Sequence, residues 1–256
     1  MSDSVLAFYE QLARDYHLIF ADWARAIERQ GSALDRLIQA HMNRMPLTVL
    51  DCACGIGTQA IGLADRGYTV HASDISPAAV ERAAQEADNY GVPLTTGVAD
   101  MRTLAAQVEG TFDVVLACDN AVPHLLSDDE LLQAAQHKHA KLRPDGLLLV
   151  SIRDYDHLTL NKPRATQPQV FDDEAEGRRI VFQVWDWAAD GSGYTVNMFI
   201  MRQHGSRWDT AHHATRYRAL LRAEYGNILA QAGFDDIRWH MPQDTGYYQP
   251  VVTARP

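Results

Sequence analysis

One stretch constrains this chain more than any other: residues 48–64, which read TVLDCACGIGTQAIGLA. An apolar run that favours a β-strand ends at Asp51, a Gly-x-Gly turn follows at Gly55 and Gly57, and a helical pattern begins at Thr58. Glycines in such a turn can adopt positive φ and carry no Cβ, so the backbone can pass close to a bound molecule. The free N–H groups at the start of the next helix can hold a carboxylate or a phosphate. The stretch therefore predicts a strand–turn–helix unit that binds a ligand at its turn.

Two acids further along the chain strengthen this prediction. Residues 69–74 read TVHASD, a second strand whose last residue is Asp74. An acid at the tip of the second strand can accept hydrogen bonds from both hydroxyls of a ribose. Asp100, followed by Met101, lies near the end of a third strand, where its carboxylate can accept from an adenine amino group. Together the strand ends indicate a cofactor that contains adenosine.

These residues resemble a known family. The segment DCACGIGT at 51–58, together with Asp74 and the pair Asp100–Met101, is similar to the class I S-adenosylmethionine-dependent methyltransferases. The resemblance covers roughly the first 150 residues and is specific for fold and cofactor. It implies an α/β fold with a doubly wound, mostly parallel, seven-stranded Rossmann-like sheet, and S-adenosyl-L-methionine as the cofactor. The implied cofactor-binding residues are Asp51, Ala53, Gly55, Gly57, Asp74, Ile75, Asp100, Met101 and Cys118.

A dinucleotide such as NAD(H) is the competing cofactor. Its G-x-G-x-x-G fingerprint places a third glycine where this chain has Ala60. Alanine is tolerated at that position, but Asp51 before the turn and Asp100 after it have no place in the dinucleotide motif. A wound domain without any cofactor is also disfavoured, because acids at three strand ends are poor choices for packing. The sequence therefore favours S-adenosylmethionine.

The length and net charge of the chain limit its domain organisation and the class of molecule that it binds. The chain has 256 residues, of which 46% are apolar, enough for one large α/β domain with an elaboration. A formal net charge of −10 argues against a nucleic-acid partner and favours a small-molecule substrate, with a protein substrate left open. The sequence shows no leader and no long apolar run, so we expect a cytoplasmic protein that spans no membrane. The oligomeric state is left open, with a homo-oligomer among the alternatives.

The cysteines and histidines do not indicate a metal or a disulfide framework. The chain has three cysteines, Cys52, Cys54 and Cys118, an odd number. Because Cys52 and Cys54 lie two apart on the predicted first strand, we expect them on the same face of the sheet, as small buried residues. His137 and His139 lie two apart on a predicted helix, so their side chains diverge. No metal site is predicted.

Hydrophobic periodicity predicts the arrangement of the chain. Residues 3–40 are helical in pattern, with a break expected at Gly31–Ser32. Two roles are open for this segment, which are compatible with each other: packing on the sheet, and a lid over the cofactor. Next come strands and helices in alternation, which indicates right-handed βαβ units: strands at 48–54, 69–75, 94–99, 112–118 and 147–152, and helices at 58–66, 77–89, 103–108 and 128–142.

The pattern changes after the fifth strand. Four β-like stretches at 168–173, 178–188, 194–204 and 211–217 predict an inserted antiparallel cap. A helix at 219–232 and strands at 236–240 and 248–254 resume the wound pattern. We therefore expect a single domain over 1–256: an N-terminal helical lid (1–45), a cofactor-binding core (46–156), a β cap insertion (157–217), and a C-terminal helix with the last two strands (218–256).

The segments after the fourth and fifth strands narrow the resemblance. Asn120 is followed four residues later by His124, and Arg153 is followed by Asp154, Tyr155 and Asp156. This pair of segments is similar to the glycine N-methyltransferase and glycine/sarcosine methyltransferase branch. The resemblance implies that Asn120 and Arg153 contact an amino-acid substrate and that Arg153 pairs with its carboxylate. A guanidinium fork is suited to that task, because it grips a carboxylate through two hydrogen bonds.

Each of these residues also has an ordinary structural alternative. Arg153 could form a salt bridge with Asp154 or Asp156, and Asn120 could cap a loop. His124 could be a base for a hydroxyl or azole acceptor, or a buried histidine bonded to a neighbouring loop. Two polar and aromatic segments, 215–218 and 246–250, could wall the substrate pocket. Trp185 and Trp187 share one face of a strand, where packing is the favoured role.

The predicted function is an S-adenosylmethionine-dependent methyltransferase that acts on a small molecule, with an amine nitrogen favoured as the acceptor. The candidate catalytic residues are Asn120, Arg153, His124 and Tyr16, the last helping to close the site. An O-methyltransferase or azole N-methyltransferase with His124 as its base is the alternative enzyme. A non-catalytic S-adenosylmethionine-binding protein is the alternative of another class.

Overall fold

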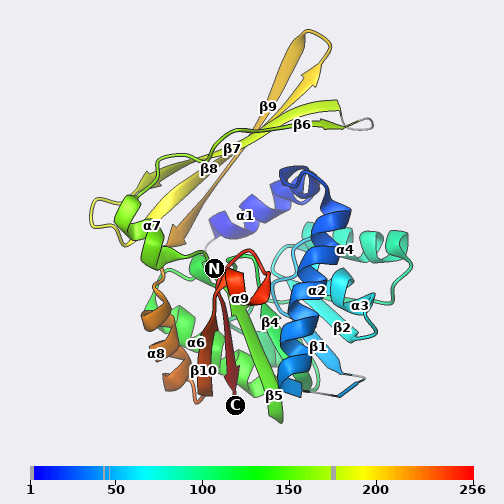
Figure 1. Cartoon of the computed structure of the whole chain (residues 1–256), viewed down its shortest axis with the longest axis vertical. Coiled ribbons are helices and arrows are strands. Elements are labelled where there is room, and N and C mark those ends of the chain that lie inside the picture. Colours follow the sequence, from blue (N-terminus) through cyan, green and yellow to red (C-terminus); the bar gives the residue numbers. More distant parts are fainter. Residues whose placement is uncertain (1–2, 43, 46, 174–176) are drawn as a thin grey trace.

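A seven-stranded sheet lies at the centre of the molecule (Figure 1). The computed structural model describes residues 3–42, 44–45, 47–173 and 177–256. The strand order is β10-β11-β5-β4-β1-β2-β3, and only β11 runs antiparallel to its neighbours, which confirms the predicted mostly parallel sheet. Its strands are β1 (Thr48–Asp51), β2 (Thr69–Asp74), β3 (Thr95–Val98), β4 (Phe112–Ala117), β5 (Leu142–Ser151), β10 (Asp235–His240) and β11 (Val251–Arg255).

Helices cover both faces of this sheet, as Figure 1 shows. On one face pack α2 (Trp23–Met42), α3 (Thr58–Ala64) and α4 (Pro77–Tyr90), and on the other α5 (Leu104–Gln107), α6 (Asp128–Lys141) and α8 (Arg222–Gln231). Val49 of β1 packs with the first set, and Leu50 packs with the second. The central strands are therefore apolar on both sides, which explains their continuous apolar runs. The short helices are η2 (Val122–His124), α7 (Tyr155–Asn161) and α9 (Pro242–Thr245).

Several predicted boundaries were wrong. Strand β1 ends at Asp51, so Cys52 and Cys54 lie in the turn, not on the strand. They pack in different apolar clusters, Cys52 on the α6 side of the sheet and Cys54 on the α2 side. The prediction that both face one side was wrong because residues alternate regularly only within a strand. Strand β5 begins at Leu142, five residues earlier than predicted, and helix α7 was not predicted.

The predicted break at Gly31–Ser32 was also wrong. Helix α1 (Asp3–Leu12) and a 3-10 turn, η1 (Tyr16–Ile19), precede α2, which continues without interruption through Gly31. Gly31 lies where α2 crosses α3 at Gly62: a Cβ on Gly31 would lie 2.7 Å from the carbonyl oxygen of Gly62. A Cβ on Gly62 would lie 2.6 Å from the carbonyl oxygen of Ile27. The glycines are required for the close approach of the two helices.

Replacing Gly31 by alanine is expected to destabilise the fold by roughly 3 kcal/mol, because the new Cβ overlaps backbone atoms that cannot move independently. The measurement is the free energy of unfolding from chemical denaturation. Gly226→Ala is the matched control: its Cβ would meet only Trp239, at 4.0 Å, within helix α8. That change is expected to stabilise the protein by about 1 kcal/mol. Equal effects of the two substitutions would contradict the packing argument.

A second sheet covers the carboxyl edge of the first. Its strands, in spatial order, are β6 (Gln169–Asp173), β7 (Gly177–Trp187), β8 (Gly193–His204) and β9 (Arg207–Arg218), all antiparallel. Helix α1 lies between this sheet and the core (Figure 1). The inner face places Trp185, Tyr194 and Tyr217 in the main apolar cluster. Residues of the opposite parity, such as Phe182 and Phe199 with ring centroids 5.0 Å apart, lie on the outer face.

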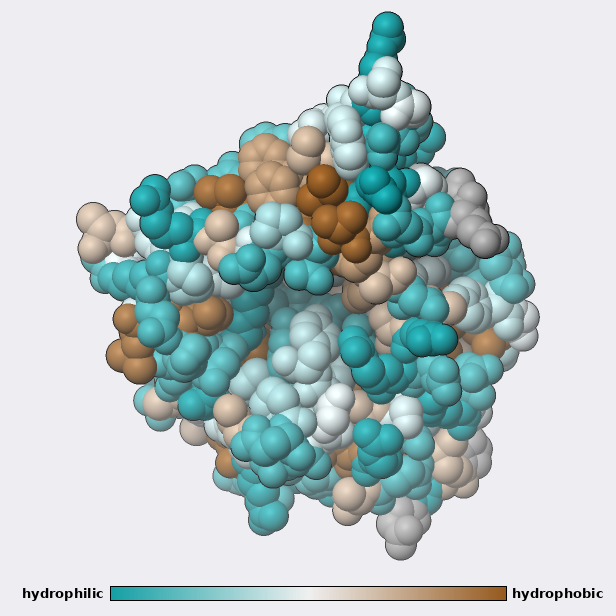
Figure 2. Space-filling view, turned by 45° about the horizontal axis from the view of Figure 1, so that its top comes forward, coloured by the Kyte–Doolittle hydropathy of each residue, from teal (hydrophilic) through white to brown (hydrophobic). Residues whose placement is uncertain are grey.

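Apolar and polar residues are unevenly distributed on the surface. In Figure 2, brown apolar residues gather in the upper part of the visible face, where the antiparallel sheet lies, while teal polar residues cover most of the remainder. Within the described part of the chain, no helix combines the length and the apolar character needed to cross a membrane.

Candidate active site

The main pocket lies at the carboxyl ends of β1 and β4, where the strand order of the sheet reverses. Open α/β sheets bind ligands at this position. The pocket contains about 550 Å³ of empty space, part of it open to solvent. Eight of the residues predicted from the sequence line it: Tyr16, Ala53, Gly55, Asp74, Ile75, Met101, Cys118 and His124.

The glycine turn forms the floor of this pocket. Gly55 and Gly57 have φ of 52° and 95°, and a Cβ on Gly55 would meet no atom within 4 Å, so the space above Gly55 is open to a ligand. The Asp74 carboxylate is fixed against this turn: it accepts from the backbone N–H of Gly55 (2.9 Å) and of Ser76 (3.0 Å). Burial raises the pKa of Asp74, and these backbone hydrogen bonds partly offset that effect. Its remaining lone pairs can accept from ribose hydroxyls.

Asp51 lies behind the turn, outside the pocket lining. It is completely buried, and its Oδ1 accepts from the backbone N–H of Ala53 at 3.3 Å. Within the described chain its Oδ2 has no hydrogen-bond partner, which is costly for a buried acceptor. Burial raises the pKa of the Asp51 carboxyl well above its usual value. The burial of Asp51 and its unpartnered oxygen are compatible with a turn that faces a ligand. The role of Asp51 in cofactor binding stays a prediction.

Asp100 is placed differently from its predicted position. Its carboxylate faces Arg102, with 2.7 Å between Arg102 Nη2 and Asp100 Oδ2, and its side chain does not line the pocket. The neighbouring residues Ala99 and Met101 do line it, together with Ile75. This end of the pocket is therefore apolar, and a hydrogen bond from adenine to Asp100 stays a prediction.

A second cavity opens beside the first, between the core and the antiparallel sheet. It contains about 910 Å³ of empty space, part of it open to solvent. Its wall includes residues of both segments that the sequence suggested for a substrate pocket: Tyr217 from the first, and Tyr248 and Gln249 from the second. Tyr16 and Asp119 line both cavities, as does Tyr9 of α1.

Arg153 lies in the second cavity. Its guanidinium donates to the hydroxyl of Tyr194 (2.7 Å) and to Oε1 of Gln183 (3.3 Å). It also lies 4.9 Å from the ring centre of Trp185 and 5.2 Å from that of Tyr217. These contacts, two hydrogen bonds to neutral oxygens and two cation–π contacts, fix the direction of the guanidinium without neutralising it.

The ordinary salt-bridge alternative for Arg153 is not what the structure contains. Asp154 and Asp156 both face Arg222, at 2.6 Å and 3.4 Å. No carboxylate of the described residues lies within 4.0 Å of the Arg153 guanidinium. A cation enclosed by aromatic rings without a counter-charge is a site for an anionic group of a ligand.

Asn120 supports the loop that carries Arg153. It is buried with φ of 66°, and its Oδ1 accepts from the backbone N–H of Arg153 and from the hydroxyl of Tyr155, both at 3.0 Å. Its Nδ2 has no partner among the residues that the structure describes. Asn120 therefore does cap a loop, and its amide still has hydrogen atoms to donate. Direct contact with a substrate stays a prediction.

His124 is buried and uncharged. Its Nε2 forms a hydrogen bond of 2.8 Å with the hydroxyl of Tyr9, and its ring lies 4.2 Å from that of Tyr217. A hydrogen bond to the backbone of Arg216 engages its other side. Burial lowers the pKa of His124 to about 3. An imidazole with this pKa does not hold a proton near neutral pH.

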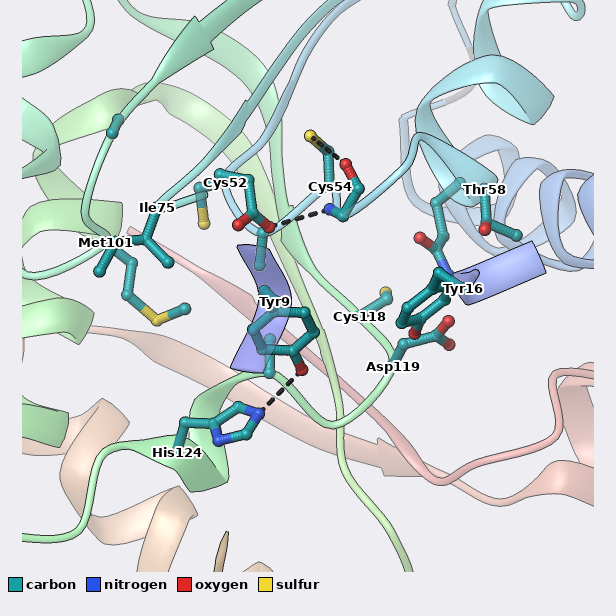
Figure 3. Close-up of a pocket in the computed structure, with 16 residues that line it drawn as sticks. Tyr9, Tyr16, Cys52, Cys54, Thr58, Ile75, Met101, Cys118, Asp119 and His124 are labelled. Carbon is teal, nitrogen blue, oxygen red and sulfur yellow. Dashed lines mark hydrogen bonds between the residues drawn. The ribbon is translucent and has the colours of Figure 1, made fainter. Parts of the chain in front are cut away.

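Sequence reasoning did not select Tyr9, Gln59 and Asp119, all of which line the main pocket. Asp119 carried a signal, because it stands between Cys118 and Asn120, two selected residues at the end of β4. Tyr9 carried only its place among the polar-tipped aromatic residues of the predicted lid. Gln59 carried no signal, since only the packing of α3 turns it toward the site. Figure 3 shows Asp119 beside Tyr16, on the opposite side of the pocket from Ile75 and Met101.

Comparison with known proteins agrees with this geometry. The family described as "Methyltransferase domain" matches residues 49–146. The glycine/sarcosine N-methyltransferase of Parasynechococcus marenigrum is 30% identical over 195 residues, which cover 71% of this chain and 66% of that enzyme. This match therefore spans about two thirds of the length of that relative.

Solved structures share the fold. An S-adenosylmethionine-dependent methyltransferase from Clostridium acetobutylicum superposes with a TM-score of 0.73 at 15% identity, covering 96% of this chain and 97% of that one. CalS10, an amino pentose methyltransferase from Micromonospora echinaspora solved with S-adenosylmethionine bound, has a TM-score of 0.69 at 20% identity, covering 90% and 92%. At these identities the likeness concerns the fold.

Proposed function

We propose that this chain, which belongs to the class I S-adenosylmethionine-dependent methyltransferases, transfers a methyl group to the nitrogen of a small amine that also carries a carboxylate. The observation that carries the proposal is the Arg153 guanidinium, enclosed in the second cavity and without an acidic partner. A small amino acid such as glycine or sarcosine has the required groups. The relative from Parasynechococcus marenigrum is named for these two acceptors.

The residues of the chain would hold the acceptor in position for the reaction. Bound S-adenosylmethionine supplies an electrophilic methyl group on a sulfonium. Methyl transfer is a direct displacement, so most of the acceleration comes from holding the acceptor in line at contact distance and from excluding water. Arg153 would hold the acceptor carboxylate, and Asn120 keeps the Arg153 backbone in place through its hydrogen bond of 3.0 Å. The rings of Trp185 and Tyr217 enclose the guanidinium and limit water around it.

The alternative enzyme, with His124 as base for a hydroxyl or azole acceptor, has less support. The pKa of His124 is lowered to about 3, and its Nε2 is already hydrogen-bonded to the hydroxyl of Tyr9. Such an imidazole is too weak a base to remove a proton from a hydroxyl or an azole. The non-catalytic alternative does not account for the Arg153 cavity, because binding of the cofactor alone needs no second cavity with an unpaired cation.

An acceptor screen tests the proposal. The purified protein is incubated with S-adenosylmethionine and amino acids, simple amines, phenols or azoles, and formation of S-adenosylhomocysteine is measured. We expect turnover with small amino acids, and a loss of at least about a hundredfold in kcat/KM for glycinamide, which lacks the carboxylate. Faster turnover of phenols, azoles or carboxylate-free amines would overturn the proposal, and no turnover with any acceptor would favour a binding protein.

A further inference from the structure

Asp119 occupies the boundary between the two cavities. Only Tyr9, Tyr16 and Asp119 line both the pocket beside the glycine turn and the cavity that holds Arg153, among the described residues. A methyl group that leaves a cofactor in the first cavity for an acceptor in the second must cross this boundary. Asp119 is also the only carboxylate among the lining residues of the second cavity. Its charge is therefore next to the place where the new bond forms.

The backbone at Asp119 is held in an unfavourable conformation. Asp119 has φ of 58° and Asn120 has φ of 66°, so two successive residues other than glycine occupy the left-handed region. Such residues are uncommon and persist where the surroundings hold them. Here the Asp119 N–H donates to Oγ of Ser151 at 2.9 Å. The strained pair sits at the end of β4, which aims the Asp119 carboxylate at the boundary between the cavities.

Two tyrosines hold the carboxylate in place. The hydroxyl of Tyr247 donates to Oδ1 of Asp119 at 2.8 Å, and the hydroxyl of Tyr248 donates to the same oxygen. Because both bonds go to Oδ1, Oδ2 keeps lone pairs for a ligand. Arg153 is near enough to affect Asp119 electrostatically but forms no ion pair with it. The opposite charges of Asp119 and Arg153 are thus held apart, which suits a ligand with a carboxylate at one end and an amine at the other.

We propose that Asp119 is the catalytic residue that receives the proton of the acceptor nitrogen and balances the positive charge that the nitrogen gains, an inference that rests on the proposed amine methylation. The protonated acceptor gives one proton to the Asp119 carboxylate, which frees the nitrogen lone pair. Asp119 passes this proton to solvent before methyl transfer, so its carboxylate is ionised again. That pair forms the new N–C bond while the S–C bond breaks and its electrons stay on sulfur. The product nitrogen then carries the positive charge that the sulfonium lost, next to the ionised Asp119 carboxylate.

The surroundings of Asp119 decide how this group titrates. Burial raises its pKa above the usual value, while the hydrogen bonds from Tyr248, Tyr247 and Gln59 and the charge of Arg153 lower it. The ionised form is the active one, so activity is expected to fall as the pH drops through this pKa. The titratable groups that interact with Asp119 from the packed elements are Tyr16, Asp51, Cys118, Arg153, Tyr247 and Tyr248.

A binding experiment tests the position of Asp119 without any acceptor. Sinefungin carries an amine where S-adenosylmethionine carries its transferable methyl group, whereas S-adenosylhomocysteine carries nothing there; the methionine ammonium is common to both. We expect the wild-type protein to bind sinefungin more tightly than S-adenosylhomocysteine. Asp119→Asn is expected to reduce this preference roughly tenfold and to leave the affinity for S-adenosylhomocysteine nearly unchanged. Asp65→Asn, the same change at an exposed residue after α3, is the matched control.

Two results would overturn the proposal. An unchanged preference in Asp119→Asn would place the carboxylate away from the transferred methyl group. Equal losses for both ligands would assign it to the methionine ammonium instead. If Asp119→Asn fails to fold, Tyr248→Phe serves: losing one hydrogen bond to the charged form raises the pKa of Asp119, so the pH below which sinefungin loses its advantage should shift upward. An unshifted pH dependence in Tyr248→Phe also contradicts the proposal. Because neither measurement uses an acceptor, they stand apart from the acceptor screen.

Discussion

Replacing Arg153 by alanine is expected to lower kcat/KM for a small amino-acid acceptor by about a thousandfold, because the acceptor carboxylate loses the guanidinium that is proposed to hold it. The dissociation constant of S-adenosylmethionine should change by less than about threefold, since Arg153 lines the second cavity and not the cofactor pocket. Steady-state kinetics with S-adenosylhomocysteine readout and calorimetric titration of the cofactor give the two numbers. Intact cofactor binding also shows that the variant is folded.

Two further variants make the result specific. Arg153→Lys keeps the charge but loses the planar fork, so it should recover only part of the activity. His124→Asn keeps a polar side chain of similar reach and should retain at least about a tenth of kcat/KM, because a histidine with a pKa of about 3 is not acting as the base. An inactive His124→Asn beside an active Arg153→Ala would instead favour a hydroxyl or azole acceptor.

The second large effect is expected at Asp74. Asp74→Asn should weaken S-adenosylmethionine binding by about a hundredfold, because an amide cannot accept at both ends from the Gly55 and Ser76 N–H groups and from ribose hydroxyls at the same time. The change disturbs the glycine turn as well as the predicted ribose contact, and both losses act on the same ligand. Calorimetric titration with S-adenosylmethionine and S-adenosylhomocysteine measures the effect.

Controls separate this effect from general damage. Asp65→Asn should leave cofactor affinity unchanged, because Asp65 is exposed at the end of α3. Titration of the wild-type protein with NADH should give no binding signal, because Asp51 before the turn and Asp100 after it have no place in a dinucleotide motif. Full cofactor affinity in Asp74→Asn would place the ribose elsewhere.

Sequence reasoning predicted the residues around the second cavity less completely than those of the glycine turn. Arg153 and Asn120 were predicted from a resemblance to a family. The contacts that determine their environment, however, come from segments far away in the sequence. The rings around Arg153 belong to β7 and β9, and the acids next to it in sequence are drawn away by Arg222. Asp119 was passed over although both of its neighbours were selected. Contacts between residues far apart in the chain leave no local pattern, so periodicity and spacing cannot reveal them.

By itself, the sequence determined the alternation of strands and helices, the glycine turn with its three strand-end acids, and hence the wound sheet and its cofactor. Each of these depends on residues close together in the chain, where side-chain periodicity and backbone freedom act directly. The tertiary structure alone decided that α2 continues through Gly31, that Cys52 and Cys54 part to opposite faces, and that His124 is too buried to be a base. It also decided that Asp119 lies between two cavities. Burial and the approach of distant backbones are properties of the packed chain, and they set the charge and the direction of every group in this site.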